Sequence, residues 1–108
     1  SDATGVDVTI KCMGDDNNAA HAAYFNVYFE KLNTDLDADS YDDGTAGYGN
    51  PNGTAGIPWD VKVVVPKANM DGVVAGDAFR LKIERDADNE SDDVTGDVQV
   101  FLVEVRET

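Results

Sequence analysis

The stretch VDVTIKC, residues 6–12, alternates apolar and polar side chains along its whole length. Val6, Val8, Ile10 and Cys12 fall on one side of an extended chain, and the residues between them are polar. Because successive side chains of a β-strand point to opposite faces of the sheet, this pattern predicts a strand with one buried face. The chain is therefore expected to be built around β-sheet.

The same alternation recurs in IPWDVKVVV (57–65) and FRLKIER (79–85). The segment AAHAAYFNVYFEKL (19–32) contains four alanines and fits a helix in part, but YFNVYF is aromatic and β-branched and it alternates. Such residues favour strands. We therefore predict a strand over 23–32, preceded at 17–22 by a loop or one helical turn.

The final candidate strand, VQVFLVEVR (98–106), differs from the others because it is apolar on both parities up to Val103. A strand of this kind is expected to be covered on both faces. The cover could come from a second layer of the same chain or from a neighbouring subunit.

Gly-, Asp- and Asn-rich connections separate the strands, the longest at 33–56 and another at 66–77. Connections as long as 33–56 are usually functional or mobile. Five or more strands at irregular spacing predict an all-β fold, an antiparallel β-sandwich of jelly-roll type. The 108 residues are expected to form a single domain, with 1–22 supplying a possible N-terminal arm and the first strand.

The composition is strongly acidic, with 8 Lys and Arg against 22 Asp and Glu and a formal net charge of −14. Repulsion from phosphate argues against nucleic acid and against anionic membrane surfaces as partners. No apolar run approaches the length of a membrane span, and no signal peptide opens the chain, so synthesis in the cytoplasm is expected. The single cysteine, Cys12, excludes an internal disulfide.

Catalytic motifs are absent from the sequence: His21 is the one histidine, and it lies among alanines. We therefore predict no enzyme activity and no cofactor. Calcium is the alternative, since alternating acids in loops supply oxygen ligands. DLDADSYDD (35–43) begins with the spacing of an EF-hand loop, and Asp86, Asp88 and Glu90 repeat it, but neither has the Gly and closing Glu of that motif.

Carbohydrate recognition would require exposed aromatic side chains. Trp59 lies on the apolar parity of its strand and is predicted to belong to the core. Tyr41 and Tyr48 lie in the 33–56 connection and are the candidates for an exposed recognition surface.

From residue 24 onward the chain contains a series of short motifs: an aromatic strand, an Asp-rich stretch, and then MDG, AGD, RLKI, RD, GD and VEVR in that order. In this sequence they are Leu36 to Tyr41, Met70 to Gly72, Ala75 to Asp77, Arg80 to Ile83, Arg85-Asp86, Gly96-Asp97 and Val103 to Arg106. This order resembles a C-terminal-type β-sandwich domain of structural proteins in the virions of tailed bacteriophages and prophages.

The resemblance implies a non-enzymatic protein of the virion surface, commonly a trimer, located on the capsid or at the distal end of a fibre. Since the match begins near the start of the chain, a capsid decoration or cement protein in contact with the major capsid protein is expected. The alternative is a receptor- or carbohydrate-binding domain of a fibre or tail protein. Asp93-Val94 departs from the usual pattern, which has a threonine there.

All three arginines, Arg80, Arg85 and Arg106, fall on the last two predicted strands beside the acidic stretch RDADNESDDVTGD (85–97). The planar guanidinium suits bidentate pairing with carboxylates, within one subunit or across a threefold axis. The candidates for such strand pairing or for a subunit interface are Arg80, Arg85, Asp86, Asp97, Phe101 and Arg106.

Overall fold

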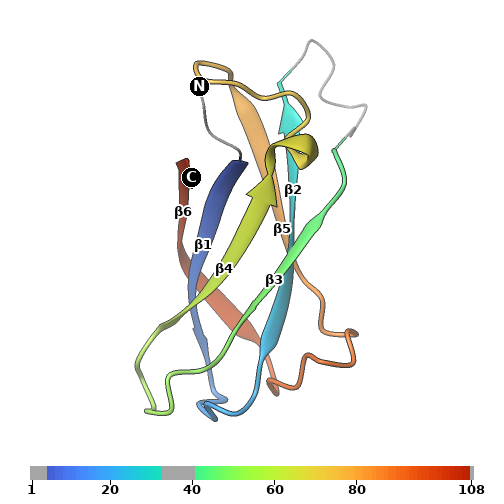
Figure 1. Ribbon diagram of the computed structural model, residues 1–108. Helices are drawn as coiled ribbons and strands as arrows, with labels where there is room; N and C mark the ends of the chain where they lie inside the picture. The colour runs from blue at the N-terminus through green and yellow to red at the C-terminus, as the bar shows by residue number, and fades with distance from the viewer. Residues whose placement is uncertain (1–4, 33–40, 108) are drawn as a thin grey trace.

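The computed structural model describes residues 5–32 and 41–107. These residues form one antiparallel sheet of six strands in the order β5-β2-β3-β4-β1-β6 (Figure 1). The strands are β1 (Gly5–Gly14), β2 (Ala23–Lys31), β3 (Thr45–Gly49), β4 (Trp59–Pro66), β5 (Phe79–Arg85) and β6 (Val98–Glu107), and a 3₁₀ turn, η2 (Lys67–Asn69), follows β4. The prediction of an antiparallel all-β chain is confirmed.

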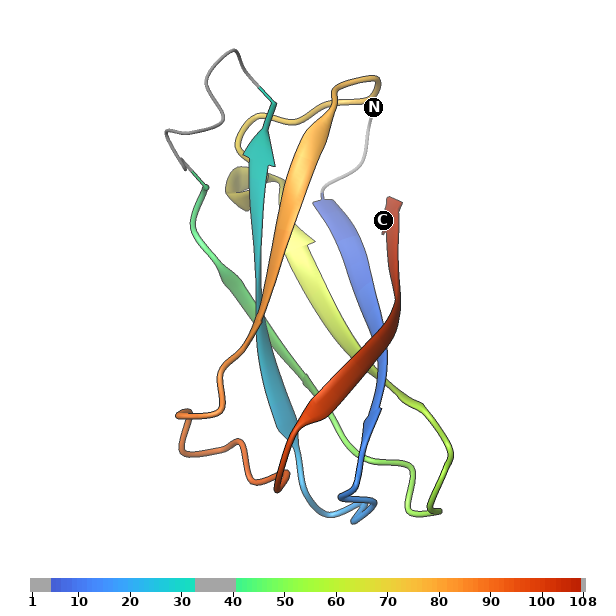
Figure 2. The same cartoon turned by 180° about the vertical axis from the view of Figure 1, so that it is seen from behind.

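The sheet curls until its two edge strands, β5 and β6, lie on the same side of the molecule, with β1 to β4 behind them (Figure 2). The concave side holds the core. Its centre is formed by residues such as Val8, Ile10, Phe29 and Val63, all with an exposed fraction of 0%. One curled sheet takes the place of two separate layers, because both halves of the sheet bury their inner faces against each other.

Strand register follows the alternation in the sequence. Along the β1–β4 pair, Val8 lies opposite Val63 and Ile10 opposite Val61, so the apolar parity of each strand faces inward. Trp59 is 6% exposed, which confirms it as a core residue. A slip by one residue would turn every one of these side chains to solvent, so the pattern also fixes the pairing.

The predicted strands are confirmed with small changes at their ends. The alternation over 57–65 predicts Ile57 on the inner face of a strand, but β4 begins at Trp59 and Ile57 is 45% exposed. Residues 17–22 form a loop with a turn and no helix. Residues 1–4 of the predicted arm lie outside the described residues, while Gly5–Gly14 is strand β1.

One prediction is wrong and another is narrowed. The connection 33–56 is not one loop, since it contains β3, whose short sequence TAGYG carries little strand signal; residues 33–40 lie outside the described part of the chain. The last strand is not covered on both faces by the described residues, because Val100, Phe101 and Leu102 are 45%, 52% and 59% exposed. Cover by a neighbouring subunit, the other alternative, stays a prediction.

Candidate functional site

The acidic connection between β5 and β6 is organised by Arg85. Its Nε and Nη2 donate to Asp92 Oδ2 and Oδ1 at 3.2 and 2.8 Å, a bidentate pair. Its Nη1 donates to the carbonyl of Gly96 and Nη2 also donates to that of Val94, both at 2.6 Å. The guanidinium of Arg85 therefore binds three groups of the connection: the Asp92 carboxylate and the carbonyls of Val94 and Gly96.

The same connection is attached to the start of β2. The Asp92 carboxylate accepts the Tyr24 amide at 2.9 Å, and that of Asp93 accepts the Ala22 amide at 2.7 Å. In return the amide of Asp86 donates to the carbonyl of Tyr24 at 2.8 Å. These bonds link segments about seventy residues apart, and they hold the lower end of the curled sheet together.

A third segment joins this network through Asp16, in the loop between β1 and β2. Its Oδ2 accepts the amide of Thr95 at 2.8 Å and contacts the His21 ring Nδ1 at 2.7 Å. The backbone amides of Thr95 and Asn18 lower the pKa of Asp16 well below its usual range, and the bond to Asp16 raises the pKa of His21. The contact between His21 and Asp16 therefore links two residues of the same loop, and we call it the histidine tie.

Charge pairing is also visible in the pKa values of the central pair. Hydrogen bonding to Asp92 raises the pKa of Arg85. Burial alone would raise the pKa of Asp92, but the Arg85 guanidinium and the Tyr24 amide outweigh it, so the pKa lies below that of an ordinary aspartate. Because Arg85, Asp92 and Asp93 bind groups of other segments, RDADNESDDVTGD links the β5–β6 connection to the start of β2, and we call this set of contacts the clamp.

No grouping of three or more His, Cys, Asp or Glu side chains suited to a metal ion occurs among residues 5–32 and 41–107. Asp88 and Glu90, two of the proposed ligands, lie in the connection organised by Arg85. The acids Asp35, Asp37 and Asp39 of the other candidate loop lie outside the described residues.

The second arginine, Arg80, forms an ion pair within the chain with the buried Glu30 of β2. Its guanidinium also lies over the ring of Tyr41, 4.8 Å from the centroid. Lys82, two residues further along β5, lies 4.3 Å from the centroid of Tyr28. Arg80 and Arg85 therefore both pair inside one subunit, on opposite faces of the same strand.

All four tyrosines lie on the convex side of β2, β3 and the segment before β3. Tyr24 stacks on Tyr48 with ring centroids 5.1 Å apart, and Tyr28 meets Tyr41 edge to face at 6.5 Å. Tyr48 is 56% exposed and lies on a strand, whereas Tyr41 is half-buried beneath the cations of β5. The four side chains form a tyrosine row, in which Tyr48 lies on a strand and Tyr41 in the segment before β3, and recognition by this row stays a prediction.

The remaining candidates lie apart from this row. Phe101 and Arg106 are on β6, where Phe101 is 52% exposed and Arg106 contacts Glu104 at 3.4 Å. Asp97 is exposed, and its charge contributes to the raised pKa of Arg85. The structure thus gathers Arg85 and Asp86 at the clamp, places Arg80 beside Tyr41, and leaves Phe101 and Arg106 on the free edge strand.

One cavity of about 200 Å³ opens at the other end of the sheet, between β5 and β6. Its walls are mainly apolar, with Phe29, Met70, Val73 and Phe79 among them, and Asp77 is held there by the amide of Val74 at 3.0 Å. The lining has no histidine, cysteine or serine, and its charged residues are Lys67, Asp77 and Glu107.

Several residues of these networks escaped the sequence analysis. Asp92 was one of many acids in its stretch, and nothing in its spacing marked it as the partner of Arg85. Tyr24 and Tyr28 did carry a signal, since they occupy the outward parity of β2, where polar residues are usual. Glu30 is 2% exposed although it continues that parity.

Comparison with protein-family models, with curated proteins and with solved structures finds no match. In the part of the chain that the structure describes, no helix is long and apolar enough to cross a membrane.

Proposed function

We propose that the chain is a non-enzymatic structural protein of a tailed-bacteriophage virion, a decoration or cement protein on the outer surface of the capsid. Its expected partners are further copies of itself, in a trimer, and the major capsid protein. We also propose that the fold is a jelly-roll-like sandwich. The inner faces of β1 and β4 meet those of β2 and β5 across one core, as the two layers of a sandwich do.

The observation that supports the proposal is that residues of the motifs that resemble virion proteins form contacts within the chain. Arg80 and Arg85, in the motifs RLKI and RD, both form ion pairs, and Gly96 of the GD motif accepts a bond from Arg85. In an enzyme, recurring charged residues are expected to face a cavity with free functional atoms. Here Arg80 links β5 to β2 and Arg85 closes the β5–β6 connection, contacts that suit a structural role.

The acidic surface agrees with this role. Most acids of the described chain lie in loops, and a capsid coated with such a protein would repel other particles. The test is co-expression with the major capsid protein of the virion to which the chain is proposed to belong, followed by sedimentation of the assembled capsids through sucrose. We expect the chain in the capsid fraction at a fixed ratio to capsid protein; a chain that stays at the top of the gradient would contradict the proposal.

A second candidate, a receptor- or carbohydrate-binding domain of a fibre or tail protein, is favoured by the tyrosine row. Stacked Tyr24 and Tyr48 present an exposed ring on a rigid strand pair, and sugar rings pack on such aromatic faces. A glycan array is the measurement. Binding that Tyr48→Ala abolishes and that Val64→Ala, an equally exposed control on β4, leaves intact would favour this candidate over the capsid.

A further inference from the structure

The strand β6 forms one free edge of the sheet. Its ten residues, Val98–Glu107, pair on one side with β1, and no strand of the described chain pairs on the other. Charges, prolines and bulges normally limit further pairing at a free edge. The first half of β6, residues 98–103, has no charge and no proline, and its one irregularity is a bulge at Phe101.

The inner face of β6 is less covered than that of β1, although Val98 and Val103 pack against the core. Val100 and Val105 lie opposite Cys12 and Val8 of β1, both 0% exposed, yet they are themselves 45% and 39% exposed. Phe101 occupies the bulge that shifts the register between Lys11 and Cys12. Together with Leu102 on the outer face, these side chains form an apolar strip along the edge.

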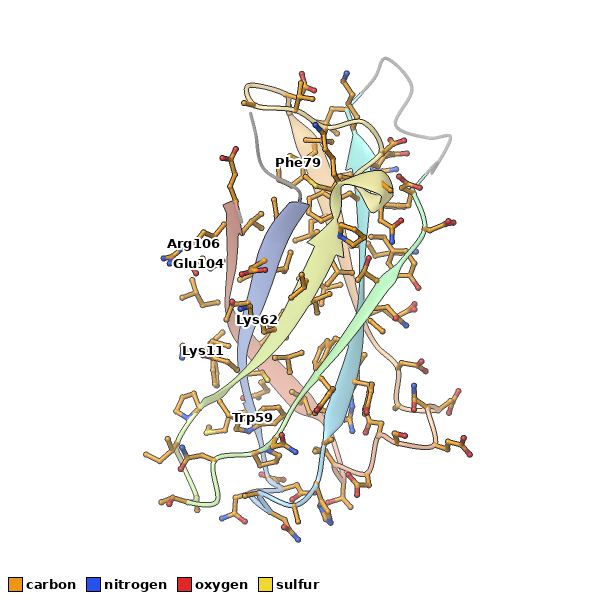
Figure 3. All side chains as sticks on the ribbon, in the orientation of Figure 1. Lys11, Trp59, Lys62, Phe79, Glu104 and Arg106 are labelled. Carbon is orange, nitrogen blue, oxygen red and sulfur yellow. The ribbon has the colours of Figure 1, made fainter. Side chains whose placement is uncertain are left out.

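The outer face beside this strip is electrically balanced. Register places Asp7 of β1 beside Arg106 and Thr9 beside Glu104, with Lys62 of β4 on the far side of Thr9. Figure 3 shows Lys11, Lys62, Glu104 and Arg106 gathered on these three strands. Three acids and three bases occupy this face: Asp7, Asp60 and Glu104, and Lys11, Lys62 and Arg106.

We propose that a second copy of this chain pairs antiparallel with the first along the free edge of β6. Two copies that each carry a net charge of −14 repel one another over most approaches, and the balanced face of β4, β1 and β6 removes that repulsion along this edge. A basic partner would be drawn instead to the acidic loops. Pairing adds main-chain hydrogen bonds and covers the apolar strip at once.

This contact is isologous, since both copies use the same strand. It therefore produces a dimer, or links two trimers into a hexamer, and it is separate from the threefold contact and the capsid binding proposed above. A species with an odd number of chains and no twofold contact would leave the virion proposal standing and overturn this one.

Sedimentation velocity of the whole chain at about 1 to 100 µM tests the proposal. We expect a dimer or hexamer, and we expect Val100→Lys and Leu102→Lys to raise its dissociation constant at least about tenfold, since a lysine on an edge strand opposes pairing. Val64→Lys is the matched control, because Val64 is 58% exposed on the outer face of β4, which β1 separates from β6. A monomer or a trimer in the wild type, or an oligomer that the β6 variants do not weaken, would overturn the proposal.

Cysteine cross-linking gives a second measurement that does not depend on the lysine variants. A residue on the twofold axis lies opposite its own copy at about 4.5 to 5.5 Å between Cα atoms, within the range of a disulfide. We expect Val103→Cys or Val105→Cys to form a disulfide-linked dimer under mild oxidation, and Val64→Cys on β4 not to. Native Cys12 is buried and does not interfere. Absence of a dimer from both β6 variants would refute the pairing.

Discussion

Replacing Arg85 by alanine tests the clamp between β5, β6 and the start of β2. The side chains of Arg85 and Asp92 are 18% and 1% exposed, so the pair is largely shielded from water. Its removal leaves a buried carboxylate that keeps only backbone donors, the amides of Tyr24 and Val94, and it frees the carbonyls of Val94 and Gly96.

Breaking a buried ion pair from one side costs about 3 to 5 kcal/mol, because the remaining charge is uncompensated. We expect a loss of this size in the free energy of unfolding of Arg85→Ala. Arg85→Lys should lose less, since an ammonium group keeps the charge but cannot span Asp92 and two carbonyls together. The control is Arg106→Ala, whose partner Glu104 is 52% exposed; we expect a change within about 0.5 kcal/mol.

The assay is urea denaturation followed by circular dichroism at pH 7, with the slope of the transition checked for two-state behaviour. Urea leaves ionic strength unchanged, so charge pairing is not screened during the measurement. If Arg85→Ala is too unstable to isolate, Arg85→Lys still allows the comparison with Arg106→Ala. An Arg85→Lys or Arg85→Ala protein as stable as the Arg106→Ala protein would refute the view that this stretch is a clamp.

Three further predictions concern the core, the histidine tie and the cysteine. Phe29→Ala removes a fully buried ring and should cost about 3 to 5 kcal/mol, whereas Val64→Ala on the outer face should change the urea midpoint little. The bond to Asp16 raises the pKa of His21 in the folded state, so the contribution of this bond to stability is complete below the unfolded pKa of about 6.5 and is lost as pH rises through the folded pKa. The urea midpoint of the wild type should therefore fall as pH rises from 6 to 8, and that of His21→Gln should fall less. Equal pH dependence in the two proteins would contradict the tie. Burial raises the pKa of Cys12 to about 11, so iodoacetamide at pH 8 should label it only after unfolding, as mass spectrometry of native and urea-treated protein would show.

Much of the fold follows from the sequence because one rule governs it. Alternating apolar residues at 6–12 and 57–65 predicted β1 and β4, apart from the start of β4 at Trp59, and the same alternation sets the register that joins them. The rule fails for β3. Its glycines Gly47 and Gly49 have no side chain to contribute to a pattern, and they are needed there because an added Cβ would lie 2.5 and 2.1 Å from carbonyl oxygens of β4.

The candidate site was less predictable, since its contacts join residues far apart along the chain. The sequence indicated that Arg85 pairs with a nearby acid, and the structure selects Asp92 because that residue can also accept the Tyr24 amide. No local pattern carries such information. For β6 the pattern was clear, but two causes produce it: a strand buried by its own chain and a strand whose cover comes from another molecule have the same composition.

The acidity of the chain has a structural cause in addition to any effect on its surface. Backbone amides at the ends of strands need acceptors wherever no partner strand supplies a carbonyl. In this protein carboxylates supply them: the aspartates that accept amides of other segments or turns are Asp16, Asp42, Asp71, Asp77, Asp92 and Asp93. An aspartate accepts such a bond best when ionised, and the lowered pKa values of Asp16, Asp77 and Asp92 reflect that preference. A fold that uses aspartates as acceptors for its loop amides requires many of them, and the negative charge of the chain follows from that requirement. A face on which acids and bases balance then requires a separate explanation, and the pairing of two copies along β6 provides one.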